Sequence, residues 1–466
     1  MTTAVQVQDI AEDAPGEDLV ARVSALSAAK GEPDWLLAWR LTALEQALEL
    51  DWWTGKEESW RRTPRDRLPR RARVGSVTYA ANGTTGLAPT HVFTPEAHAG
   101  LVHQMGGGVV GSDLAPEAQS AGVILAPLSA AAREHPELVQ RWLGSVGDPL
   151  DRYEAFGRAL WIQGVFCYVP PGVVVSESLF YLITQQANGG DHWHYTLVVA
   201  DRESQLSLID AGDADDRAAE LEETPFVHAS VELIAEPGSQ LQFATVQRWH
   251  RQTAAVSTTR GEVGRDATVR VTTAAFGADL DKQRIDMNLG QPGGHAELRG
   301  LFVGDQRQQI EHVTRQHHTG VGATSDLLIR GVLTDESHAV QYGVIRIEPE
   351  GQKTSAFQTM RNLLLDDGAG ADPIPVLEIE ADDVKCSHAA AVGPVSPDQL
   401  FYLQARGIPP QIAERLVVRG FLSEIADGIP DQHLREVIDE LVEIQLHIPE
   451  PAPEPSLEPA MSGAPA

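Results

Sequence analysis

Leu327-Leu-Ile-Arg-Gly-Val-Leu333 and Tyr342-Gly-Val-Ile-Arg-Ile347 are short runs of apolar and β-branched residues, separated by polar residues that include Asp335-Glu336. Runs of this kind, bounded by turn residues, are typical of β-strands. Similar runs recur between about residues 164 and 395, at Gly164–Val169, Tyr195–Val199, Val231–Ile234 and Leu241–Val246. No long amphipathic helix interrupts them. The pattern therefore predicts a sandwich, a barrel or a β-solenoid, and periodicity alone leaves all three open.

Near the end of this region the chain reads Ile379-Glu-Ala-Asp-Asp-Val-Lys-Cys-Ser-His388. Side chains two apart on a strand point to the same face, so Cys386 and His388 can reach one metal or cluster atom together. Lys385 and His388 beside Cys386 predict a lowered pKa for its thiol, which favours binding of a soft metal. Two side chains do not complete a four-coordinate site. Any such site must take its other ligands from water, distant residues or another chain.

Helical patterns flank the β-region on its N-terminal side. Trp35 to Leu48 repeats apolar residues at helical spacing, and Asp34 is the expected N-cap. Short helices are also predicted at Ser129–Glu134 and Pro136–Trp142. The acidic residues 1–18 are predicted to be disordered.

On the C-terminal side, Ser396-Pro-Asp-Gln399 predicts a helix start with a capping box, and Gly407 can end that helix. A second helix is predicted from about Pro410 to Arg419, and a third follows Asp431. The last residues, 449–466, are rich in Pro, Ala and Glu and are predicted to be disordered.

Charge and composition exclude several function classes. Acidic residues outnumber basic ones 66 to 36, for a formal net charge of −30, which argues against partners such as nucleic acid or an anionic membrane. The one basic run, between Arg61 and Arg73, is interrupted by Pro64 and Pro69 and predicts an extended, solvated linker. Two cysteines exclude a disulfide framework, and the chain shows neither a signal-peptide pattern nor a membrane-spanning apolar run. We expect a soluble cytoplasmic protein.

Several apparent motifs are rejected. Gly106-Gly-Gly-Val-Val-Gly111 fits GxGxxG but lacks the strand–helix context of a dinucleotide site, and Gly351-Gln-Lys-Thr354 lacks the remainder of a P-loop. The pairs His192/His194 and His317/His318 have no third ligand at a motif distance and are interpreted as surface or inter-strand hydrogen-bonded histidines. Cys167 is expected to pack as a small apolar residue. We therefore find no parts of a self-sufficient enzyme.

The stretches that remain resemble the SufB/SufD family of iron–sulfur cluster assembly proteins. The resemblance covers about residues 30 to 445 and is carried by these stretches: Pro33-Asp-Trp-Leu-Leu-Ala-Trp-Arg40, Gly164-Val-Phe-Cys-Tyr-Val-Pro-Pro-Gly172, Gln358-Thr-Met-Arg-Asn-Leu-Leu-Leu365, Asp382-Asp-Val-Lys-Cys-Ser-His-Ala-Ala-Ala-Val-Gly393 and Asp398-Gln-Leu-Phe-Tyr-Leu-Gln-Ala-Arg-Gly-Ile408. Within the family it is closer to SufD. SufB-like chains often carry an N-terminal cysteine motif, a Glu-His-Glu-Ala type sequence at Lys385–His388, and a cysteine near Phe357–Arg361, and this chain has none of them. Ala389 and Ala391 depart from the glycine and threonine frequent in SufD, a change that leaves Cys386 and His388 in place.

The resemblance implies a mainly β protein, with a right-handed parallel β-helix between helical N- and C-terminal regions. Together with the composition of the two termini, it gives the following expected organisation: a disordered N-terminus at 1–18, a helical and mixed region at 19–150, the β-helix at 151–395, a C-terminal helical region at 396–448 and a disordered tail at 449–466. It also implies a non-catalytic scaffold that pairs with a SufB-like chain through the end of the β-helix, and that docks the ABC-type ATPase SufC on its C-terminal helices.

Site residues follow from the same resemblance. A transient iron–sulfur cluster or iron atom is expected at the partner interface, with His388 and Cys386 as candidate ligands, and would pass to apo-protein acceptors. The SufC-docking residues expected are Phe401, Tyr402, Arg406 and Gly407. No nucleotide is expected on this chain.

Two alternatives stay open. The chain could act as a SufB-like homodimer with SufC, although the missing cysteine near Met360 argues against it. It could also be a β-solenoid carbohydrate-active enzyme, since Asp and Glu are abundant, although no segment singles out a catalytic pair of carboxylates.

Overall fold

We analysed a computed structural model, in which the described residues are 16–70, 98–185, 191–214, 224–429 and 431–446. Residues 1–15 and 447–466 lie outside these ranges, so the disorder predicted for 1–15 and 449–466 stays a prediction. Helix α1 (Gly16–Lys30) begins inside the N-terminal acidic stretch, so the prediction of disorder is wrong for residues 16–18. No helix in the described ranges is both long and apolar enough to cross a lipid bilayer.

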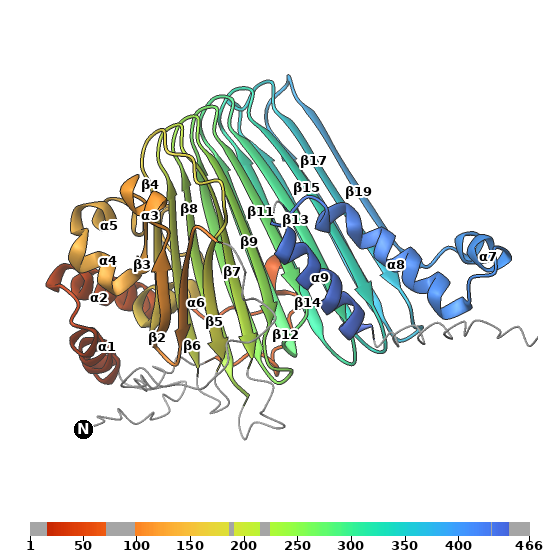
Figure 1. The fold of residues 1–466 in the computed structure, drawn as a ribbon, viewed down its shortest axis with the longest axis horizontal. Coiled ribbons are helices and arrows are strands. Elements are labelled where there is room, and N and C mark those ends of the chain that lie inside the picture. The colour runs from red at the N-terminus through yellow and green to blue at the C-terminus, as the bar shows by residue number, and fades with distance from the viewer. Residues whose placement is uncertain (1–15, 71–97, 186–190, 215–223, 430, 447–466) are drawn as a thin grey trace, which may run out of the picture.

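The core is a parallel β-solenoid with two sheets that face each other (Figure 1). Sheet A has ten strands, in the order β19-β17-β15-β13-β11-β9-β7-β5-β1-β2. Their bounds are β1 (Gly100–Met105), β2 (Gly108–Leu114), β5 (Leu179–Gln185), β7 (Gln205–Ala214), β9 (Gln240–Arg248), β11 (Thr268–Ala275), β13 (His295–Gly304), β15 (Thr324–Leu333), β17 (Ser355–Leu364) and β19 (Lys385–Pro394). The predicted parallel β-helix is confirmed.

Sheet B has nine strands, in the order β18-β16-β14-β12-β10-β8-β6-β4-β3. Their bounds are β3 (Ile124–Pro127), β4 (Gln163–Val169), β6 (His192–Ala200), β8 (Phe226–Ala235), β10 (Ala254–Val263), β12 (Leu280–Leu289), β14 (Gln309–His318), β16 (His338–Ile347) and β18 (Gly370–Ile379). Alternate residues of both sheets point inward and form one continuous apolar core along the solenoid. The left-handed conformations at Gln306, Asp335 and Lys353 make the tight turns between the sheets.

The N-terminal end of the solenoid is closed by the chain itself. Helices α2 (Asp34–Glu49), α4 (Leu128–Glu134), α5 (Pro136–Trp142) and α6 (Arg152–Leu160) gather beside the first turns, and α6 packs on β6 and β8 (Figure 1). Antiparallel strands β2 and β3 terminate the two sheets, with helix α3 (Pro116–Ser120) between them. The predicted helices at Trp35–Leu48, Ser129–Glu134 and Pro136–Trp142 are confirmed. The predicted N-cap is wrong, because Pro33 holds that position and makes no side-chain cap.

Gly106 and Gly107 form the tight turn of the β1–β2 hairpin, both with positive φ. The GxGxxG stretch therefore lies in a β-hairpin and not in the strand–turn–helix context of a dinucleotide site.

The segment predicted as an extended linker is instead fastened to sheet B. A short 3-10 helix, η1 (Glu58–Trp60), precedes it, and Thr63 Oγ1 donates to Glu311 Oε2 at 2.7 Å. The same carboxylate oxygen accepts from Lys282 Nζ at 2.7 Å, a buried ion pair. The extended-linker prediction is thus wrong for residues 61–70, and residues 71–97 lie outside the described ranges.

In the residues described up to 446, three helices follow the last strand: α7 (Pro397–Ala405), α8 (Pro410–Ala426) and α9 (Gln432–Gln445). Helices α8 and α9 lie along the outer face of sheet A, while α7 projects away from it (Figure 1). Gly407 ends α7 with φ +86, as predicted. The third predicted helix does follow Asp431, whose side chain also caps α9 by accepting from Leu434 N. The predicted capping box is wrong, because Ser396 makes no side-chain cap, and α8 runs seven residues beyond the predicted Arg419.

Candidate functional site

The C-terminal end of the solenoid is its open end, where the last strand of each sheet has no further strand beside it in the described residues. Strand β19 pairs only with β17, and β18 pairs only with β16. Nearly every residue of β19 is exposed, whereas the first strands β4, β5 and β6 are fully buried. The candidate site lies on β19.

Cys386 and His388 sit on the inward-facing side of that last strand. In the β17–β19 register, Cys386 lies beside Ala356 and His388 lies beside Gln358, and both of those β17 residues are buried in the interior. Strand alternation therefore directs both predicted ligands toward the space between the two sheets. The predicted same-face arrangement is borne out by the register, and it places the pair at the mouth of the solenoid.

The two candidate ligands differ in environment. Cys386 is half-buried and packs against a small apolar cluster that includes Ile345, Ile347 and Ala381. His388 is exposed, and its ring makes no hydrogen bond within the described part of the chain. Thus the Cys386 thiol is shielded and the His388 imidazole faces solvent.

The expected lowering of the Cys386 pKa is wrong. Burial among apolar side chains raises the pKa of this thiol above its ordinary value. Lys385 is one residue away on the strand, so its side chain points to the opposite face. A raised pKa favours the protonated thiol, so a metal that bound Cys386 would have to displace that proton.

These two donors form an incomplete site. Among the described residues, no group of three or more His, Cys, Asp or Glu is arranged to hold a metal ion. A tetrahedral metal needs four ligands, and an imidazole with one thiol supplies two. The two side chains together supply half of such a ligand set.

Gln358 is a residue of this site that sequence reasoning quoted but gave no role. It lies directly beneath His388 in the register and is buried. Its amide nitrogen donates to the carbonyls of Gly343 at 3.4 Å and Val376 at 3.3 Å, which ties the strand below His388 to sheet B. The sequence signal for Gln358 was a polar residue at an inward-facing position of β17, the strand that pairs with the one carrying Cys386 and His388.

Helix α7 presents the predicted partner residues to solvent. Phe401 is 73% exposed and Tyr402 57%, and α7 has no buried residue. The Arg406 guanidinium stacks over the Tyr402 ring at 5.0 Å. Between α7, α8 and sheet A lies a groove of about 650 Å³, lined by Arg330, Leu363, Asp398, Gln399, Tyr402, Leu403, Leu416, Val417, Gly420 and Phe421. Large exposed aromatic side chains beside a groove are typical of a protein-docking surface.

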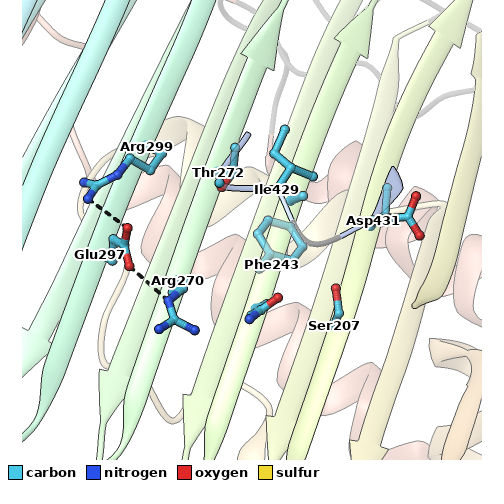
Figure 2. Close-up of a pocket in the computed structure, with 12 residues that line it drawn as sticks. Ser207, Phe243, Arg270, Thr272, Glu297, Arg299, Ile429 and Asp431 are labelled. Atoms are coloured by element: carbon cyan, nitrogen blue, oxygen red, sulfur yellow. Dashed lines mark hydrogen bonds and ion pairs between the residues drawn. The ribbon is translucent and has the colours of Figure 1, made fainter. Parts of the chain in front are cut away.

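A smaller pocket lies on the outer face of sheet A, beneath the α8–α9 connection (Figure 2). Glu297 pairs with Arg270 at 2.9 Å and with Arg299 at 2.8 Å, so its charges are already compensated. The pocket has a volume of about 30 Å³, which leaves room for about two water molecules. This pocket is not a candidate ligand site.

The remaining histidine and cysteine predictions have mixed outcomes. His317 pairs with Glu348 at 3.1 Å and His318 with Ser325 at 2.9 Å, as predicted. His192 and His194 are buried inside the solenoid, their rings stacked with centroids 6.2 Å apart, so a surface position is wrong for them. Cys167 is fully buried, as predicted, and burial raises its pKa to about 12.

Comparison with known proteins identifies the family. A family model described as SUF system FeS cluster assembly, SufBD core domain, matches residues 181–421, which span β5 to α8. The chain belongs to the SufB/SufD family. It is 29% identical over 336 residues to the iron–sulfur cluster assembly protein SufD of Bacillus subtilis, covering 71% of this chain and 75% of that one.

Two further relatives agree. An iron–sulfur cluster assembly SufBD family protein of Mycobacterium tuberculosis is 34% identical over 317 residues, covering 66% of this chain and 77% of the relative. A SufBD family protein of Pyropia yezoensis is 26% identical over 342 residues, covering 71% and 69%. The chain is thus a SufBD family member of the Suf iron–sulfur cluster assembly system, close to SufD.

Proposed function

We propose that this protein is the SufD-type scaffold subunit of a Suf complex, working with a SufB-like chain and the ABC-type ATPase SufC. The observation that carries the proposal is the position of Cys386 and His388, two metal-binding side chains on the last strand of an uncovered solenoid end. A chain that binds an iron–sulfur cluster together with a partner is expected to carry only half of the ligands, at an uncovered end of its solenoid. The partner would supply the other ligands at the joined ends, and apo-proteins would receive the finished cluster.

We infer an order of use for the two candidate ligands from their chemistry. A neutral imidazole accepts a metal without losing a proton first, whereas the Cys386 thiol has a raised pKa and must release one. His388 would therefore bind iron or the nascent cluster first, with Cys386 following or supporting it. Replacing a thiolate ligand by imidazole changes cluster charge and potential, which suits a site that has to release what it builds.

SufC would dock on the C-terminal helices, at Phe401, Tyr402, Arg406 and Gly407 beside the groove. ATPase activity would then reside in SufC, and this chain would contribute no catalytic group.

Contacts between α8 and the solenoid would transmit a movement of α8 to the candidate site. Arg330 on β15 donates to the Phe421 carbonyl and pairs with Glu424, both on α8. Strand β15 pairs with β17, which pairs with β19, so a shift of α8 would reach the site across two strand neighbours.

The test compares histidines on the same solenoid. His388→Ala, Cys386→Ala and the control His338→Ala, an outward-facing histidine that is 41% exposed, are each expressed with the native SufB-like chain and SufC. We expect His388→Ala to lower iron and sulfide recovered per anaerobically purified complex by at least about tenfold, Cys386→Ala to lower it less, and His338→Ala to leave it unchanged. Cluster assembly at the wild-type rate with His388→Ala would mean that the ligand role is wrong.

The proposal places the protein in the cytoplasm, in keeping with its two unpaired cysteines, Cys167 and Cys386. No observation favours the SufB-like homodimer or the carbohydrate-active enzyme over it.

A further inference from the structure

A pocket that the proposed function does not use lies on the outer face of sheet B. Its floor is made by β10, β12 and β14, and its wall by Val146 and Leu150 of the α5–α6 connection, residues 143–151. The volume of the pocket is about 160 Å³. A cavity of about 150 Å³ accommodates a molecule the size of benzene, so this pocket suits a ligand of about six non-hydrogen atoms.

Two of the charged side chains in the pocket are satisfied by the protein itself. Arg260 on β10 donates to the Asp148 carbonyl at 2.6 Å and pairs with Glu154 at 3.3 Å, which ties the α5–α6 connection to the sheet. Asp286 on β12 pairs with Arg284 at 3.1 Å. These contacts form the pocket and leave neither charge in need of a ligand.

Two further charged groups of the pocket, one of each sign, lack a charged partner. Arg315 on β14 makes no hydrogen bond or ion pair within the described ranges. Glu262 on β10 accepts a hydrogen bond from the neutral amide of Asn288, whose Nδ2 lies 2.7 Å from Glu262 Oε2. Burial raises the pKa of the Glu262 carboxyl above its ordinary value, although the Asn288 hydrogen bond and the charge of Arg260 act in the opposite direction.

Arg315 and Glu262 do not pair with each other, because β12 lies between their strands. Two strand spacings separate β10 from β14, about 9.6 Å. The two residues are also offset along the strands, since Arg315 lies beside Asp286 in the register and Glu262 lies beside Asn288. A small molecule that satisfies both groups must therefore carry a negative group at one end and a positive group at the other.

We propose that this pocket binds a small α-amino acid, with its carboxylate on Arg315 and its ammonium group on Glu262. A guanidinium can hold a carboxylate through two parallel hydrogen bonds. Val146 and Leu150 then contact the amino-acid side chain, which favours a short apolar one such as that of alanine or valine. His317, at the same pocket, already pairs with Glu348 at 3.1 Å.

The inference does not rest on the proposed function, because the pocket is complete within this chain. Its test needs no SufB-like chain, SufC or cluster, so its failure would leave the proposed function as it stands.

The first experiment is isothermal titration calorimetry of the full chain with L-alanine and L-valine, and with acetate and methylammonium, which each carry one of the two charges. We expect a Kd of about 1 mM or tighter for at least one of the two amino acids, and affinities at least about tenfold weaker for acetate and methylammonium. Neither amino acid binding at about 10 mM, or acetate binding as tightly as the amino acids, would overturn the proposal.

The second experiment repeats the titration with variants. Arg315→Gln and Glu262→Gln each remove one charge, and the matched control is Arg270→Gln, a strand arginine of sheet A that is 42% exposed and pairs with Glu297. We expect the first two variants to weaken amino-acid binding about tenfold or more, and the control to stay within about twofold of wild type. Leu150→Trp, which fills the pocket without changing its charges, should abolish binding. Wild-type affinity in Arg315→Gln would overturn the proposal.

The third measurement locates the bound amino acid and checks that the variants fold. A ligand held between the α5–α6 connection and sheet B should slow amide hydrogen exchange in residues 143–151 of the wild-type chain. The same amino acid should leave this exchange unchanged in Arg315→Gln, whose exchange without ligand should match that of wild type elsewhere in the solenoid. Binding to the wild-type chain with no slowing in residues 143–151 would show that the amino acid binds at another place, and would overturn the proposal.

Discussion

The two ends of the solenoid follow opposite designs. At the N-terminal end the chain covers its own edges, with antiparallel strands β2 and β3 and a group of helices, and the first parallel strands are buried on both faces. At the C-terminal end β18 and β19 are left uncovered, although three more helices follow. Two of these, α8 and α9, lie along the face of sheet A instead of across its end (Figure 1). Helices α8 and α9 could have covered this end but pack on the face of sheet A. This placement supports our proposal that the open end is an interface.

The largest effect is expected at the closed end, from Arg40→Ala. The Arg40 guanidinium is fully buried and donates to both carboxylate oxygens of Glu32 at 2.8 Å, and also to the carbonyls of Ala159 at 2.9 Å and Trp161 at 3.1 Å. Removing it leaves the buried Glu32 carboxylate without its counter-charge. We expect the free energy of unfolding to fall by about 3–5 kcal/mol, measured by urea denaturation.

The control is Arg61→Ala, whose side chain is 64% exposed and pairs with Glu58 at 3.4 Å. It should leave the unfolding midpoint where it is. If Arg40→Ala behaved in the same way, the helices at the closed end would not be held through Arg40.

Two truncations to alanine, one in the interior and one at the open end, compare the two regions directly. Leu298 on β13 is fully buried, and Val392 on β19 is 40% exposed. Leu298→Ala should cost about 3 kcal/mol of unfolding free energy, and Val392→Ala less than about 1 kcal/mol in the isolated chain. Equal costs would show that the open end is covered even without a partner.

The buried histidines of the interior predict a loss of stability in acid. Burial lowers the pKa of His312 to about 4, whereas the unfolded value is 6.5. Between these values the unfolded chain binds a proton that the folded chain does not, so stability falls as the pH falls below 6.5. At pH 5 this one histidine accounts for about 2 kcal/mol, which His312→Gln should remove from the difference between pH 7.5 and pH 5.

Urea denaturation at both pH values measures that difference, and the pH 7.5 value alone gives the cost of the substitution itself. Leu298→Ala, which changes no titratable group, should show the same loss at both pH values. If His312→Gln lost as much unfolding free energy between pH 7.5 and pH 5 as wild type does, His312 would contribute nothing to the acid sensitivity.

Strand positions could be predicted from the sequence because each strand buries alternate apolar residues between polar turns. The choice of a solenoid over a sandwich or barrel could not, because all three bury alternate residues in the same way. That choice came from the resemblance. The Cys386/His388 pair followed from i, i+2 spacing on a strand, a local rule that the tertiary structure does not change.

The electrostatics of the site could not be predicted in the same way. Lys385 beside Cys386 indicated a lowered thiol pKa, but the apolar cluster around Cys386 is built from β16, β17, β18 and the turn before β19, so only the fold reveals it.

The smallest effect compares two helix starts at the open half of the molecule. The sequence predicted a capping box at Ser396, yet the Ser396 side chain caps nothing on α7, the helix that projects from the solenoid. Asp431 does cap α9, since its carboxylate accepts from Leu434 N at 2.8 Å and Leu434 packs against sheet A. Asp431→Ala should therefore cost about 1 kcal/mol and raise amide exchange in α9, while Ser396→Ala should change neither. The opposite result, with Ser396→Ala the costlier change, would mean that α7 is held against the protein in solution and is not free to meet a partner.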